Sequence, residues 1–433
     1  GSFILNGSSN TTRFDYNVDI SDGLFDIINL GNLKSSGSYD GRYLNIDKVE
    51  SNYKNNNIYG SGKIPFDFNI SSKNFGSFFQ NDSIKFNVNG DLEELSFLSP
   101  YISDLDSVKG EIDIFLVLDG AMNNIQRNGS ININEGTIYT LLLNDPIINI
   151  NANAMMEKNN LVIEQLTGSI YHDNGKNLKP IKNNTNVYGS INFSKFFNPA
   201  YNIKIKSKDA SFKILYLDIS GQSNLDLTIS GKDTVMIAGE IEASDLGVFY
   251  EFTMEEIGTA ISYEKEIVLS YQILIPIRGN SYFQNSQVDA KVFGELSLFQ
   301  LGNQEIDFGG QIFIEDGSVF SYKDNFNGLQ GLVSFDNKGF NPYIDASAFT
   351  LIDDERIDLR ISGGIEDLDI ILESESGFSE SDILELLTWG KRFEDQELTS
   401  VGFGNQTVSF LGSLLENQLE KNLKESNTGV MSY

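Results

Sequence analysis

The feature that most constrains this chain is an alternation of apolar and polar side chains that recurs along most of its length. In residues 224–231, leucine and isoleucine take every second position, aspartate and threonine take the positions between them, and a glycine follows. Successive side chains of a β-strand point to opposite faces of a sheet, so this pattern predicts a strand with one buried face. Residues 130–136 and 356–362 repeat the pattern. The sequence therefore predicts an all-β fold.

Longer phrases indicate how these strands are connected. Residues 129–139, 239–250 and 310–320 each read as a strand, a turn that contains glycine, and a return strand with aromatic residues. The spacing between the phrases is irregular, which is typical of a degenerate array of long antiparallel-type hairpins rather than a solenoid of fixed period. Residues 111–118 are apolar on both faces, so we expect this strand to be covered twice or to face lipid on one side.

The apolar period changes from two to that of a helix near the end of the chain. Residues 379–382 form a capping-box sequence ahead of four apolar residues spaced for one helical face. Residues 406–424 carry a second apolar stripe. We therefore predict amphipathic helices over about 379–389 and 406–424, followed by a flexible tail over 426–433.

Composition and charge exclude several classes of function. The net charge of −30 argues against a nucleic-acid partner, because phosphate binding requires clustered Lys and Arg. The chain has no cysteine and one histidine, His172, so the sequence offers no disulfide scaffold and no zinc site. The acidic clusters are most simply solvated turns, and no nucleophile and base are arranged for catalysis. We therefore predict no enzyme activity, no catalytic residue, no metal and no cofactor.

Three phrases near the C-terminus resemble, in their order as well as their composition, the C-terminal domain of the TamB family. Residues 310–322 are similar to the family's strand–glycine–strand hairpin. Residues 331–346 are similar to its apolar strand followed by Asn-Pro and an Asp-Ala strand. Residues 372–390 resemble its strand, serine-rich turn and leucine-rich helix that ends in an aromatic residue and glycine. Upstream, residues 108–150 look like the family's repeated module.

The resemblance implies a fold, a location and partners. It implies an elongated β-sheet curled along its length into an open trough, with a repetitive segment over residues 1–309 and a TamB C-terminal-like domain over 310–425. It also implies a periplasmic protein of a diderm bacterium that is anchored in the inner membrane, so membrane contact would come through an anchor outside this chain or through a partner. Phospholipid and an Omp85-type outer-membrane barrel are the partners that the resemblance implies.

Two sets of residues are candidates for function. An apolar trough would shield lipid acyl chains along its length, so no single residue needs to be specific. Its candidate lining residues are the inward-facing members of the alternating strands, namely Ile112, Ile114, Leu116, Leu118, Ile131, Ile133, Leu225, Leu227, Ile229, Ile312, Ile314, Ile357, Leu359 and Ile361. The candidates for docking a partner are the apolar tail residues Ile383, Leu384, Leu387, Trp389, Leu414 and Leu415.

Each of these hypotheses has an alternative. The alternating strands could form the core of a closed sandwich instead of a trough. The tail helices could cap the open end of the sheet instead of docking a partner. In place of phospholipid transport between the inner and outer membranes, the chain could be a scaffold for outer-membrane protein assembly or a β-structured surface adhesin.

Overall fold

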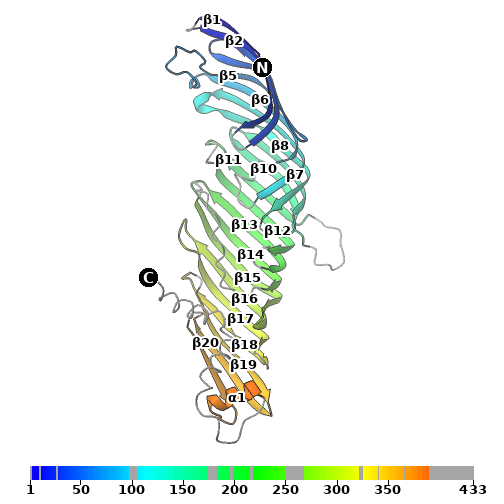
Figure 1. The fold of residues 1–433 in the computed structure, drawn as a ribbon, viewed down its shortest axis with the longest axis vertical. Coiled ribbons are helices and arrows are strands. Elements are labelled where there is room, and N and C mark those ends of the chain that lie inside the picture. Colours follow the sequence, from blue (N-terminus) through cyan, green and yellow to red (C-terminus); the bar gives the residue numbers. More distant parts are fainter. Residues whose placement is uncertain are drawn as a thin grey trace, which may run out of the picture. The chain divides into compact units, whose positions relative to one another are not determined.

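The structure is a computed structural model that describes residues 2–8, 11–25, 28–96, 105–141, 143–172, 183–195, 198–214, 218–249, 268–320, 325–339, 341–364 and 367–389. Within these residues the chain forms 21 β-strands and one α-helix, labelled in Figure 1. It divides into two compact units. Unit 1 comprises Gly1–Leu215 and Leu225–Met236, and unit 2 comprises Tyr216–Asn224 and Ile237–Tyr433.

Unit 1 is built of long strands joined in sequence order. Its strands are β1 (Ser2–Ser8), β2 (Thr11–Phe25), β3 (Ile28–Tyr39), β4 (Tyr43–Tyr53), β5 (Asn56–Pro65), β6 (Ser83–Glu94), β7 (Leu105–Ala121), β8 (Gln126–Thr140), β9 (Ile147–Glu157), β10 (Asn160–Ser169), β11 (Thr185–Asn192) and β12 (Ala200–Ile214). A short 3-10 helix, Met122–Asn124, joins β7 to β8. From β1 to β12 each strand pairs antiparallel with the next. The prediction of an all-β fold of long hairpins is confirmed.

Two strands, β13 (Ile219–Gly231) and β14 (Thr234–Val248), contribute residues to both units. The other strands of unit 2 are β15 (Val268–Gln284), β16 (Val288–Gln300), β17 (Asp307–Phe320), β18 (Asn325–Asp336), β19 (Pro342–Ile352), β20 (Glu355–Gly364) and β21 (Asp367–Ser374), followed by helix α1 (Glu380–Trp389). From β15 to β21 the pairing is again antiparallel and sequential. The domain boundary predicted between residues 309 and 310 lies inside β17, and it stays a prediction.

The sheet in each unit is open. Among the described strands, no pairing joins the last strand of a unit to its first, and the sheet is not strongly curled. The prediction of a curled trough is therefore wrong in one respect, because the sheet is not strongly curled. A closed sandwich is also wrong for the described strands, because it needs two facing sheets. Alternation fixes which side chains share a face, whereas curvature depends on bulges and strand twist that a single strand's pattern does not encode.

Glycines occupy strand positions where no other residue would fit. Gly62 in β5 has a φ of +148°, and a Cβ atom there would lie 2.1 Å from the Lys85 carbonyl oxygen of β6. Gly294 in β16 has a φ of +149°, and its Cβ would lie 2.2 Å from the Gln311 carbonyl oxygen of β17. Only glycine adopts these conformations without strain, so the close approach of neighbouring strands depends on it.

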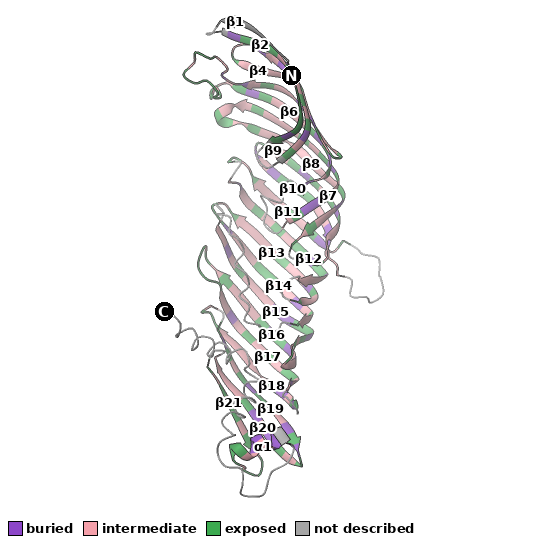
Figure 2. Cartoon of the chain, in the orientation of Figure 1, coloured by how far each residue is buried: buried purple, intermediate pink, exposed green. Residues whose placement is uncertain are grey.

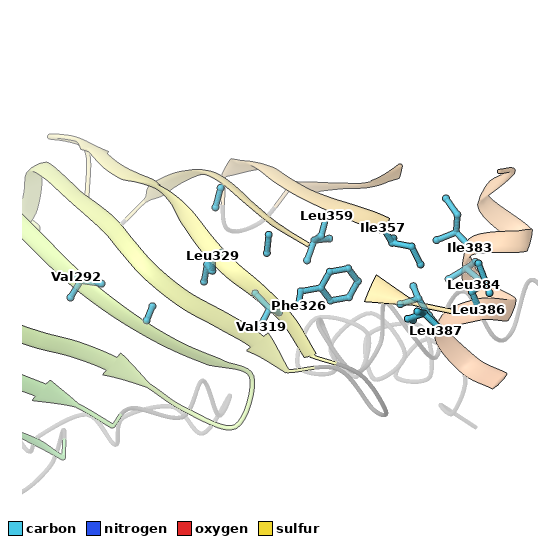
Figure 3. Close-up of a cluster of buried hydrophobic side chains, with 14 residues drawn as sticks. Val292, Val319, Phe326, Leu329, Ile357, Leu359, Ile383, Leu384, Leu386 and Leu387 are labelled. Atoms are coloured by element: carbon cyan, nitrogen blue, oxygen red, sulfur yellow. The ribbon is translucent and has the colours of Figure 1, made fainter. Parts of the chain in front are cut away.

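The main hydrophobic core of unit 2 lies where α1 covers the last strands. Figure 3 shows Ile383, Leu384, Leu386 and Leu387 of the helix beside Ile357, Leu359 and Phe326 of the sheet. The first helix was predicted at about residues 379–389, which is confirmed. Its capping box is formed as expected, with the Ser379 hydroxyl accepting from the Asp382 amide and the Asp382 carboxylate accepting from the Ser379 amide. The second predicted helix, over 406–424, and the tail over 426–433 lie outside the described residues.

Candidate functional site: an apolar sheet face

Apolar side chains form continuous rows across the strands of unit 1. Ile114 of β7 lies opposite Ile131 of β8, Ile131 lies opposite Ala154 of β9, and Ala154 lies opposite Ile163 of β10. On either side of this row, neighbouring rows of the same face contain Leu116 with Gly129, and Ile112 with Ile133. We call this set the unit 1 apolar face: Val88, Leu92, Ile112, Ile114, Leu116, Leu118, Ile131, Ile133, Ala154 and Ile163.

Most of the candidate groove residues in unit 1 are half-buried. Ile114, Leu116, Leu118, Ile131 and Ile133 all keep part of their surface exposed, as Figure 2 shows along the strands of this unit. Their neighbours on the same sheet therefore cover only part of each side chain. This leaves an apolar surface that a chain of CH₂ groups could cover.

Ile112 differs from its neighbours on this face. It is buried in a local cluster with Leu92, Leu95 and Val108, which closes one end of the face. Because these side chains already cover it, Ile112 packs as core rather than lining an open surface.

The opposite face of unit 1 is polar. Asp113, Asn132 and Asn153 lie opposite one another on β7, β8 and β9. Phe115 and Val117, which made residues 111–118 look apolar on both sides, point to this polar face, where Phe115 is exposed. The two faces thus differ in chemistry: one is aliphatic, and the other combines Asn and Asp with exposed apolar side chains such as Phe115, Met155 and Val162.

The candidates on β13 follow the same alternation. Leu225, Leu227 and Ile229 are half-buried, while Asp226 between them is exposed. The expectation of one apolar and one polar face therefore holds locally in this strand.

In unit 2, the candidates divide between core and half-buried surface. Ile312, Ile314 and Ile361 are half-buried and pack against the edge of the core. Ile357 and Leu359 are fully buried within it, beside α1. These last two side chains are therefore part of the protein's own interior rather than of an exposed groove lining.

The candidate docking residues of α1 also pack inside the protein. Ile383, Leu384 and Leu387 are buried against the sheet, so in this structure they are not exposed to a partner. The helix covers apolar strand surface, as the capping alternative expected. Trp389 ends α1, and its side chain is not among those described. Leu414 and Leu415 lie outside the described residues.

The titratable groups show no catalytic arrangement within the part of the chain that the structure describes. No three His, Cys, Asp or Glu side chains gather there to hold a metal ion. His172 places its Nδ1 2.5 Å from Asp145 Oδ2, and its backbone amide donates to Ser211 Oγ, so it ties two loops to β12. The Arg42 guanidinium donates two hydrogen bonds to Asp82 and lowers the pKa of that carboxyl. These two pairs join structural elements of the described part of the chain, and each binds its charged groups to one another.

Two features of the site were missed at the level of sequence. Ala154 and Ile163 complete the central apolar row, and the alternation in residues 147–157 and 160–163 could have revealed them. The second is a cluster of aromatic residues around the connection between β5 and β6. Its members are Phe14, Tyr39, Phe66, Phe68 and Phe78, and they follow no strand or helix period in the sequence.

The described helices offer no span of sufficient length and apolarity to cross a lipid bilayer. The described strands form open antiparallel sheet in which an aliphatic face lies opposite a more polar one. Residues 249–432 match the family model described as the TamB C-terminal domain. This part of the chain, which includes β15 to β21 and α1, is therefore similar to the TamB C-terminal domain.

This similarity favours a role in biogenesis of the cell envelope. A comparison with curated proteins gives no significant match.

Proposed function

We propose that this protein shields phospholipid acyl chains on its apolar sheet face and conducts phospholipid between the inner and outer membranes of a diderm envelope. The observation that carries the proposal is the unbroken row from Ile114 to Ile163, which crosses four strands in register on a half-exposed face. The similarity of residues 249–432 to the TamB C-terminal domain supports a role in the envelope.

The energetics favour a lipid over a specific small ligand. Each CH₂ group removed from water contributes about 0.8 kcal/mol, so an acyl chain gains affinity from many equivalent contacts and needs no unique recognition residue. The apolar face supplies aliphatic side chains of similar depth on successive strands. A lipid can therefore move from one row to the next with little change in its surroundings.

The opposite face and the net charge suit this function. Asn and Asp side chains on the polar face keep it hydrated, and a net charge of −30 opposes association of one sheet edge with another. The proposed setting is the periplasm, with an inner-membrane anchor and an Omp85-type barrel as partner.

The test is whether phospholipid co-purifies with the full chain and depends on the apolar face. We expect extracted lipid to fall several-fold in the double variant Ile131→Asn and Ile163→Asn, because both side chains lie in the central row. Met155→Asn is the matched control, since Met155 is an apolar residue of the neighbouring strand that points to the polar face.

Circular dichroism must first show that all variants keep their β-structure. Absence of phospholipid from the unaltered protein, or equal lipid loss in the Met155→Asn control, would contradict the proposal. Crosslinks to an Omp85-type barrel without any captured lipid would favour the assembly-scaffold function instead, and localisation at the cell surface would favour the adhesin.

A further inference from the structure

The connection between β5 and β6, residues 66–82, is a built loop and not a simple turn. Asp67 lies at its start and is almost completely buried. Its carboxylate accepts hydrogen bonds from the Ser72 hydroxyl at 2.5 Å and from the Asn69 amide and side chain, each at 3.0 Å. The Asp67 carbonyl also accepts from the Gly76 amide at 2.9 Å. These bonds hold the loop in one shape.

Aromatic packing fixes the loop to the sheet. The Phe68 ring lies 5.5 Å from that of Phe14 and 5.2 Å from that of Tyr39, and the Phe66 ring lies 4.5 Å from that of Phe68. The Phe68 amide donates to the Tyr39 hydroxyl at 3.2 Å. At the base of the loop, Arg42 forms its two-bond pair with Asp82. The loop is therefore rigidly mounted on unit 1.

This rigid loop presents large apolar side chains to solvent. Ile70 is 70% exposed, Phe75 is 57% exposed and Phe78 is 44% exposed. Ile70 and Phe75 remain mostly in water after folding, so they contribute little hydrophobic stabilisation, whereas Phe78 also packs against Phe66. A cluster of this kind on an ordered loop marks a surface that contacts something else.

The charge around the tip indicates what that contact is. The loop contains Lys73 and two acidic residues, Asp67 and Asp82. Asp67 is buried and hydrogen-bonded within the loop, and Asp82 is paired with Arg42 at its base, so Lys73 is the charged side chain of the tip between them. Apolar and aromatic side chains beside a lysine, spaced by Ser and Asn, suit the boundary between lipid headgroups and acyl chains.

We propose that the loop of residues 66–82 is a membrane-contact element, which inserts Ile70 and Phe75 into the surface of a phospholipid bilayer while Lys73 meets the headgroup phosphates. The loop also connects to the apolar face. Phe14 and Tyr39, on which it packs, lie in register with Leu44, and Leu44 lies opposite Ile64.

Ile64 shares the face of Ile58, which is opposite Gly90 in the central apolar row. A docked loop would thus bring the end of the apolar face to the bilayer. This second step rests on the proposed function, whereas the membrane contact does not.

The test is binding of the full chain to vesicles of phosphatidylethanolamine and phosphatidylglycerol, measured by flotation. Burying an apolar side chain of this size contributes enough that Ile70→Ser and Phe75→Ser should each weaken binding about tenfold. Leu24→Ser is the matched control, because Leu24 is 70% exposed at the opposite end of the same strands. Since all three side chains are exposed, circular dichroism should show that none of the variants loses β-structure.

A second readout locates the contact. The chain has no cysteine, so Asn74→Cys can carry a single environment-sensitive dye at the loop tip. We expect its emission to shift to the blue when vesicles are added, and the same dye at Leu24→Cys not to shift. The proposal is overturned if the unaltered protein does not float with vesicles, if Ile70→Ser and Phe75→Ser float as well as it does, or if the Asn74→Cys dye does not respond. Flotation is measured apart from lipid co-purification, so either proposal can fail alone.

Discussion

Replacing Leu359 by alanine tests the assignment of this residue to the interior of unit 2. Leu359 is fully buried in β20, where it lies opposite Ala348 of β19 and Leu372 of β21 and belongs to the cluster that includes α1. Leu→Ala in such a position removes apolar contacts and leaves a cavity. We expect the free energy of unfolding of unit 2 to fall by about 3–5 kcal/mol.

The same hairpin provides a matched control. Leu351 of β19 is 65% exposed, so Leu351→Ala should change the unfolding free energy by less than about 0.5 kcal/mol.

Unfolding in urea can be followed through Trp389, the single tryptophan of the chain, which lies at the end of α1 in the same unit. With a denaturant slope of about 1–3 kcal/mol/M, the Leu359→Ala midpoint should fall by at least about 1 M. Equal midpoints for the two variants would show that Leu359 is not core and that α1 does not seal this part of the sheet.

Three further predictions concern local structure. Gly62→Ala should destabilise unit 1 by at least about 2 kcal/mol, because its Cβ would strike a backbone carbonyl, whereas Gly90→Ala in the neighbouring strand meets only ordinary contacts; thermal melting would separate them. Ser379→Ala should cost about 1 kcal/mol by removing the cap of α1, and a melting curve unchanged from the parent would refute the capping role. The hydrogen bond from Ser72 lowers the pKa of Asp67, so its stabilisation of the 66–82 loop is present above the ordinary aspartate pKa and is lost as pH falls through the lower folded value. The protection factor of the Asn69 amide, which corrects for slower intrinsic exchange in acid, should fall only in that acidic range, and Asp67→Asn should abolish the dependence.

The sequence predicted features that depend on local pattern. The alternating residues 130–136, 224–231 and 356–362 lie in β8, β13 and β20, because alternation directly specifies which side chains share a face. The first helix was also predictable, since Ser379 and Asp382 satisfy each other's backbone amides without help from the rest of the fold.

Features that depend on distant segments were not predictable in the same way. Ile357 and Leu359 have the same alternation as Ile131 and Ile133, yet only the first pair is sealed, because α1 returns over β20 after the chain has passed through β21. The curvature of the sheet depends on bulges and on glycines such as Gly62, whose close approach involves the next strand.

The aromatic cluster at the 66–82 loop also depends on segments that are distant in the sequence. Its members come from β2, β3 and the loop itself, so no local period reveals it. Sequence reasoning therefore identified the apolar face, but it did not identify which parts of that face the protein covers for itself.

The most direct test of the central claim is photo-crosslinking from two adjacent positions of β7. Leu116 lies on the unit 1 apolar face and Val117 lies on the polar face, and both are apolar and half-buried. A photoreactive amino acid at Leu116 should capture phospholipid in cells, whereas the same group at Val117 should capture little. Equal capture at the two positions, or none at Leu116 in a folded protein, would contradict the account that the apolar face carries lipid.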